Sequence, residues 1–171
     1  MKKLLIILLI IPLVLVLIFS IKIYNRNKCY GIYMTQSNYM DHKTEKFLDY
    51  ICDEDIEGLK SMFCEKNKAD CDLDKQLKEA FEFIDGDIVS YDSPYGASGE
   101  TTSDGKVIMS SMNPVIHNIL TSNKKKYDII FYYKIVYEEH PEYVGITQIT
   151  ITDITNDKNS DKKYVIGKFY R

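Results

Sequence analysis

Hydrophobic residues change their spacing twice along this chain, and the three regimes predict three kinds of structure. Residues 4–19 are apolar without exception, residues 37–84 repeat apolar side chains at helical spacing, and the residues after Gly86 alternate with a period of two. Helices followed by strands are typical of α+β folds. The sequence therefore predicts an N-terminal transmembrane helix, then about three helices packed on one face of a curved antiparallel sheet of four to six strands.

The first apolar segment is long enough to cross a lipid bilayer. Counted through Tyr24 it has 21 residues, and a helix of that length extends about 31 Å, close to the thickness of the hydrocarbon layer. Lys22 and Tyr24 suit the membrane interface. We therefore predict a membrane anchor over residues 1–24, a juxtamembrane linker over 25–36 and an α+β domain over 37–171.

A cleaved signal peptide and a buried core helix are the alternatives for this segment. Lys2 and Lys3 suit a signal peptide, but residues 20–28, directly after the apolar run, contain no pair of small residues spaced as in A-x-A. The same two lysines favour a cytoplasmic N-terminus. This pattern predicts a single-pass protein of the cell membrane whose C-terminal domain is extracytoplasmic.

The remaining chain divides at Gly86 into predicted helices and predicted strands. The helices are expected over residues 37–52, around 56–63 and over 73–84, where the last has a regular apolar stripe that ends at Gly86. Residues 92–105 are polar and glycine-rich, which predicts a loop. Pro114 predicts a break or a bulge in the second strand. The strands are expected over residues 88–91, 106–112 with 115–120, 127–137, 144–153 and 164–170, with 127–137 central.

Charge excludes one class of partner. The chain has 22 Lys and Arg against 25 Asp and Glu, and five of the basic residues lie in the first 28 positions, before any acid. The part after Lys28 therefore has a formal charge of 17 − 25 = −8. A domain this acidic repels phosphate backbones, so nucleic-acid binding is not expected.

Residues 55–63, 81–91, 118–121 and 144–146 resemble a known family over the stretch from about Tyr39 to Asp153. It is a family of uncharacterised, lipoprotein-like extracytoplasmic proteins of low-GC Gram-positive bacteria, classed as a domain of unknown function. The resemblance implies a cone-shaped fold similar to nuclear-transport-factor-like or cystatin-like proteins. It implies a location outside the cytoplasm and brings no known activity.

Candidate chemistry is sparse. Four cysteines permit several pairings, and Cys64 with Cys71 would close a short loop between two helices in an oxidising compartment. Free thiols are the alternative. Asp70, Asp72 and Asp74 begin like a calcium loop, but Lys75 stands where that loop needs glycine, so a helix start is expected. No metal, cofactor or catalytic set is predicted.

Aromatic residues of the long strand offer the only candidate pocket. Tyr132, Tyr133 and Tyr137, with His117 on the preceding strand, could line a cavity between sheet and helices, or they could simply be core. The preferred hypothesis is a binding or protein-interaction module for an envelope protein or a small ligand. The alternative is a small enzyme using a conical pocket, with Asp, His and Tyr as acid and base. A third possibility is an immunity-type or stress-linked envelope protein.

Overall fold

The computed structural model describes residues 2–33, 35–156 and 162–170. It divides into two units, Met1–Tyr39 and Met40–Arg171.

The first unit consists mainly of helix α1, Lys2–Tyr30, followed by the short 3₁₀ helix η1, Gly31–Tyr33. The helix continues past Tyr24 into the segment predicted as a linker. The apolar side chains from Ile10 to Phe19 are exposed, with Leu13 at 70% and Phe19 at 66%. In the part of the chain that the structure describes, no helix is both long enough and apolar enough to cross a membrane. The predicted membrane-spanning helix is therefore not confirmed.

The helices of the second unit precede its sheet, as predicted for an α+β fold. They are α2 (Gln36–Cys52, which starts in the first unit), α3 (Ile56–Ser61), α4 (Glu65–Lys68) and α5 (Leu73–Phe83). Helix α4 lies where a loop was predicted, because its four residues have no apolar stripe. The buried side chain of Asn67 fixes this turn by donating a 2.6 Å hydrogen bond to the carbonyl of Thr147.

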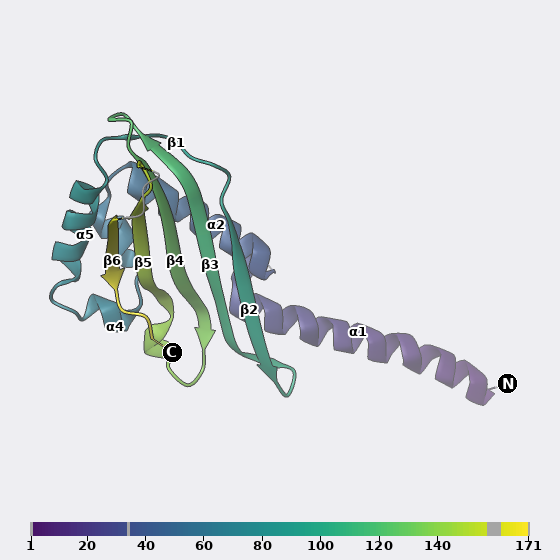
Figure 1. Ribbon diagram of the computed structural model, residues 1–171. Helices are drawn as coiled ribbons and strands as arrows, with labels where there is room; N and C mark the ends of the chain where they lie inside the picture. The colour runs from purple at the N-terminus through teal and green to yellow at the C-terminus, as the bar shows by residue number, and fades with distance from the viewer. Residues whose placement is uncertain (1, 34, 157–161, 171) are drawn as a thin grey trace. The chain divides into compact units, whose positions relative to one another are not determined.

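Six strands form one open antiparallel sheet (Figure 1). Along the main path the order is β1-β3-β4-β5-β6, and β2 also pairs with β3. Strand β4 lies in the middle of this path, which confirms the prediction that residues 127–137 are central. The strands are β1 (Ile88–Ser90), β2 (Tyr95–Ser103), β3 (Lys106–Thr121), β4 (Lys126–Tyr137), β5 (Gly145–Asp153) and β6 (Lys162–Gly167).

Two local predictions were wrong. Residues 95–103 form strand β2 rather than a loop, because β2 lies at an edge where polar and glycine residues can face solvent while the backbone pairs with β3. Pro114 does not interrupt β3, which runs continuously past it opposite Gly96. A side chain at position 96 would meet the backbone of Asn113 at 2.6 Å, so the glycine permits this close approach.

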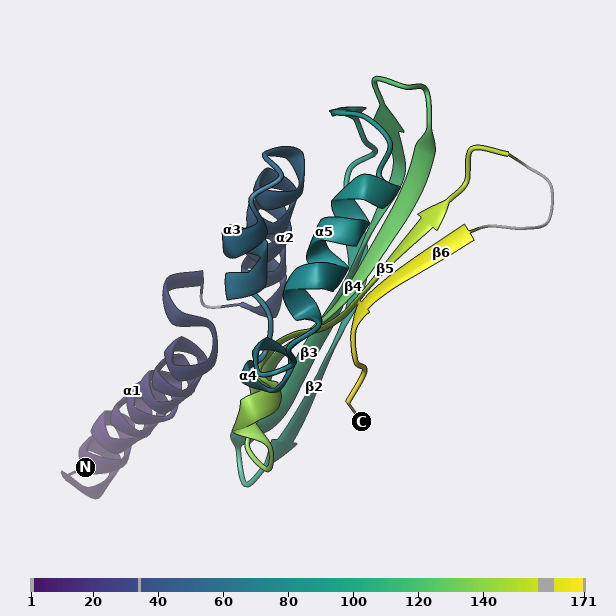
Figure 2. The ribbon, with the colours of Figure 1, turned by 90° about the vertical axis from the view of Figure 1, so that its left-hand side faces the viewer.

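The helices of this unit cover one face of the sheet, here called the helix-covered face, and leave the other open (Figure 2). Side chains of β3 alternate in the same way, since Met112, Pro114 and Ile116 are buried, whereas Asn113 and Val115 between them are half-exposed. Phe47 of α2 stacks on Phe131 of β4 with ring centroids 4.3 Å apart. The predicted stripe of α5 is confirmed, because Leu73, Leu77 and Ala80 are buried.

Candidate functional site

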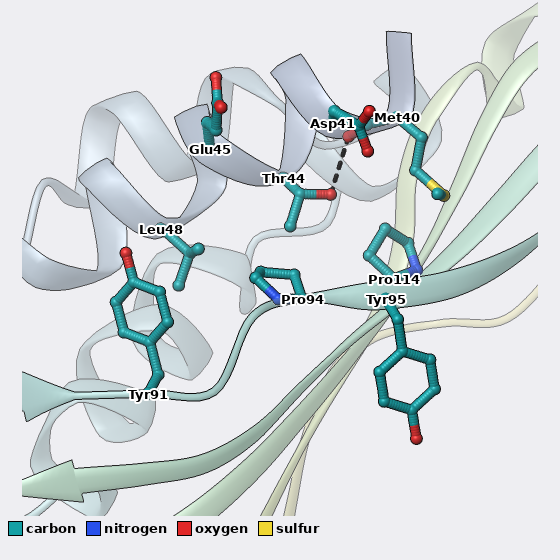
Figure 3. A pocket seen from close by; sticks show the side chains of 9 residues that line it. All are labelled: Met40, Asp41, Thr44, Glu45, Leu48, Tyr91, Pro94, Tyr95 and Pro114. Atoms are coloured by element: carbon teal, nitrogen blue, oxygen red, sulfur yellow. Dashed lines mark hydrogen bonds between the residues drawn. The ribbon is translucent and has the colours of Figure 1, made fainter. Parts of the chain in front are cut away.

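A pocket lies on the helix-covered face, between α2 and the chain that leads into β2 (Figure 3). Its volume is about 330 Å³, within the range of small ligand sites. We call it the helix-side pocket. Its lining residues are Met40, Asp41, Thr44, Glu45, Leu48, Tyr91, Pro94, Tyr95 and Pro114.

Helix periodicity places the pocket's polar and apolar groups. Asp41 and Glu45 are one turn apart on α2 and are exposed, whereas Leu48 is buried. The side chains of Leu48 and Tyr91 point toward one another across the pocket, while the Tyr95 ring points away from it (Figure 3). The pocket therefore combines an apolar interior with two carboxylates at its rim.

A second hollow, of about 320 Å³, lies on the open face, where Phe169 and Tyr170, which follow β6, meet side chains of β4. We call it the tail groove. On β3 its lining side chains alternate with the buried residues Ser110 and Met112, which places them on the open face. The lining residues are Met109, Ser111, Asn113, Tyr132, Tyr133, Lys134, Thr147, Phe169 and Tyr170.

Asn67 fixes the chain segment that forms one wall of this groove. Its Oδ1 accepts hydrogen bonds from the Tyr170 hydroxyl at 3.0 Å and from the Lys168 backbone N–H at 3.3 Å. Phe169 then meets Tyr132 edge-on, with ring centroids 5.1 Å apart. One buried amide of α4 therefore holds residues 168–170 beside the sheet.

Lys134 is the buried cation of the tail groove, with 8% of its surface exposed. Its Nζ lies 4.0 Å from the ring centroid of Tyr137 and 5.6 Å from that of Tyr143. Aromatic faces attract a cation in this geometry. Burial lowers the pKa of Lys134 below its ordinary value, because the charged ammonium loses hydration.

The structure separates the four residues predicted to share a cavity. Tyr132 and Tyr133 line the tail groove, although the Tyr133 ring also lies below Lys43 Nζ of α2, at 5.8 Å. Tyr137 packs on Lys134 outside the groove lining. His117 is farther along β3 and lines neither hollow.

His117 instead belongs to a hydrogen-bonded chain at a β-bulge. His117 and Asn118 together lie opposite Asp128, and Asn118 has a φ of 52°. Asp128 accepts from both bulged residues, at 2.6 Å from His117 Nδ1 and 3.0 Å from the Asn118 backbone N–H. The Tyr95 hydroxyl lies 2.7 Å from His117 Nε2. No sequence pattern predicts this hydrogen-bonded network, because its members lie on three strands.

One stretch of the chain, from within α2 to beyond β5, matches a known family. Residues 46–159 match a family described as Domain of unknown function (DUF5104). The chain belongs to the DUF5104 family. No match was found among curated proteins. The DUF5104 segment contains β1 to β5, with Lys134 and the His117 bulge, and it stops before β6 and residues 168–170.

The predicted cysteine pair and the acids next to Cys71 lie around α4 in the DUF5104 segment. Cys64 is buried and Cys71 exposed, and both are free thiols in the structure. Their predicted disulfide therefore stays a prediction. Asp70, Cys71 and Asp72 approach one another, but Asp70 Oδ2 already pairs with Lys168 Nζ at 2.8 Å. The hydrogen bond from Lys168 lowers the pKa of Asp70, which identifies this acid as a structural ion-pair partner.

Proposed function

We propose that this chain is a binding domain that receives an apolar group of a partner protein in the helix-side pocket. The observation that carries the proposal is the combination of an apolar interior of about 330 Å³ with two rim carboxylates, Asp41 and Glu45. Apolar side chains that are followed by a basic residue suit such a site, because the base can pair with the rim. Interfaces are commonly anchored by a few side chains that fill pockets of this kind.

We also propose that helix α1 holds the domain at a bacterial membrane, on its extracytoplasmic side. The support comes from the sequence, in which residues 4–19 are all apolar, and from the exposure of the side chains from Leu13 to Phe19. A helix that is apolar on every side needs an apolar environment. The family resemblance favours the same location, together with a cone-shaped fold.

The enzyme alternative has weaker support. A conical active site needs a histidine or carboxylate that points between sheet and helices. His117 points to the open face, and the acids of the helix-side pocket are exposed on one helix. The hydrogen-bonded network of Tyr95, His117 and Asp128 resembles an oriented base. His117 and Asp128 line neither hollow, and the Tyr95 ring points away from the helix-side pocket (Figure 3).

Site-specific photocrosslinking in the expressing cells tests the binding proposal. A photoreactive p-benzoylphenylalanine would replace Tyr91 in the pocket or, as a matched control, Val165 on β6, since these side chains are 43% and 46% exposed. We expect a discrete crosslinked product at position 91 and none at position 165. Addition of Asp41→Asn and Glu45→Gln should weaken the product. Equal labelling at both positions, or none at position 91, would contradict the proposal.

Labelling of intact cells tests the location. Cys52 and Cys71 are exposed, whereas Cys64 is buried. After reduction, a membrane-impermeant maleimide should label the protein in intact cells. A variant with Cys52→Ser and Cys71→Ser should lose most of that labelling. Labelling only after lysis would place the domain inside the cell.

A further inference from the structure

Lys134 is unusual because it is a buried cation without an acidic partner in the described chain. The ion pairs of the described residues are made by seven other cationic groups. Lys134 Nζ donates none of the hydrogen bonds found among these residues. Burial of a charge is costly unless an opposite charge or hydrogen-bond acceptors compensate it. Tyr137 and Tyr143 supply only part of this compensation through their ring faces.

The ammonium remains reachable. Among the described residues, every fully enclosed side-chain nitrogen or oxygen has a hydrogen-bond partner. Because Lys134 Nζ has no such partner there, some of its surface must be accessible. Lys134 lines the tail groove, so the groove is the hollow through which a ligand can approach it.

The rest of the groove suits a small ring. Tyr132 and Phe169 present aromatic surface in an edge-on pair, and Tyr170 stacks on Tyr143 with centroids 4.5 Å apart. The volume of about 320 Å³ is at the small end of ligand sites. The acidic domain offers no general attraction for anions, so binding must come from this local cation.

We propose that the tail groove binds a small aromatic carboxylate, whose carboxylate pairs with Lys134 Nζ and whose ring lies against Tyr132 and Phe169. This site lies on the opposite face of the sheet from the helix-side pocket, and the inference does not rest on the proposed function. Charge pairing in the buried groove supplies specificity, because a neutral ligand of the same shape leaves the ammonium uncompensated.

The test is an NMR titration of the full chain in a neutral detergent, with 4-hydroxyphenylacetate as the probe. We expect saturable shifts at the backbone amides of Asn113 and Thr147. The neutral analogue 4-hydroxyphenylacetamide should bind at least about tenfold more weakly, as expected for loss of one charge-assisted contact. Lys134→Met, which keeps the apolar stem, should lose binding by a similar factor, whereas the exposed Lys163→Met should bind normally.

A second variant keeps the test decisive if Lys134→Met fails to fold. Phe169→Ala removes exposed ring surface from the groove and leaves the cation in place. It should weaken the acid and the amide by the same factor, and so preserve the preference for the acid. Shifts that do not saturate, equal binding of acid and amide, or unchanged binding by folded Lys134→Met would each overturn the proposal.

Discussion

The hydroxyl of Tyr164 on β6 donates a 2.7 Å hydrogen bond to Glu79 Oε2 on α5. This contact joins an edge strand to the helix layer, and the Tyr164 ring also lies beside Phe83, with centroids 5.7 Å apart. Burial, followed by the hydrogen bond to Glu79, raises the pKa of Tyr164 to about 12. The folded protein therefore retains this phenolic proton at a pH where the unfolded chain loses it.

Tyr164→Phe should lower the free energy of unfolding by about 1 kcal/mol near neutral pH, because one hydrogen bond is lost. The folded pKa is raised, so the contribution of Tyr164 is fully present below about pH 10 and declines as the pH rises toward about 12. Urea unfolding near pH 8 and near pH 11 measures the difference in free energy of unfolding between the variant and wild type. This difference should be smaller at the higher pH. The exposed Tyr91→Phe is the control, and a difference that grows with pH would contradict this reasoning.

Gly145→Ala should destabilise the domain by more than about 2 kcal/mol, the range of backbone strain combined with overpacking. Gly145 has a φ of 121°, and a Cβ there would lie 2.7 Å from the Cys64 backbone nitrogen. Gly99→Ala on β2 is a matched control, since a Cβ at that position meets nothing within 4 Å. Thermal or urea unfolding of both variants measures the effect. Similar stability of the two variants would contradict the close approach at Gly145.

Asn67→Leu should lower the free energy of unfolding by about 1–3 kcal/mol, because the buried carbonyl of Thr147 loses its hydrogen-bond donor. It should also raise amide exchange at Lys168, because the segment beside the tail groove loses its acceptor. Asn123→Leu is the control, as its hydrogen bond to Asp85 is exposed. Unchanged exchange at Lys168 would show that other contacts hold this segment.

In its neutral form, His117 should carry its proton on Nδ1. The Asp128 carboxylate can only accept, so Nδ1 must donate and Nε2 is left to accept from the Tyr95 hydroxyl. Nitrogen NMR of the imidazole distinguishes the tautomers. Asp128→Asn should remove the preference for the Nδ1-protonated tautomer. A proton on Nε2 of neutral His117 in the wild-type protein would refute this tautomer assignment.

Leu13→Lys combined with Leu17→Lys should release the protein from the membrane fraction, if α1 lies in lipid as proposed. Each lysine near the middle of a membrane helix costs about 2.5–3.5 kcal/mol. Alkaline carbonate extraction followed by centrifugation measures the retained fraction. Leu13→Ile with Leu17→Ile should stay in the pellet, and equal retention of the lysine variant would argue against a membrane location.

Periodicity predicted the parts of the fold in which one face is buried. The stripe of Leu73 and Leu77 marked α5 correctly, and the apolar strand around Phe131 was correctly placed in the centre. Strand β2 was missed because an edge strand of glycine and polar residues has no burial pattern to read. Helix α4 was missed because a distant carbonyl, that of Thr147, fixes it.

The candidate sites depended on pairings that sequence alone does not contain. Tyr132 and Tyr133 were named as pocket residues, but whether a strand faces helices or solvent depends on register and bulges. Lys134 left a readable signal, since it is the single charge among the apolar and aromatic residues 129–137 of the central strand. The contact of His117 with Asp128 left none, because it requires the extra residue at the β3 bulge.

That extra residue determines which side chains of β3 beyond the bulge face the helices. Ile116 and Ile119 are both fully buried although they are three positions apart, because the bulge at His117 and Asn118 resets the alternation. Removal of one residue there would rotate Ile119 and Thr121 toward solvent and turn Leu120 inward in their place. Related chains can therefore change the identity of residue 118, but they cannot shorten the strand at this point without a second compensating deletion or insertion.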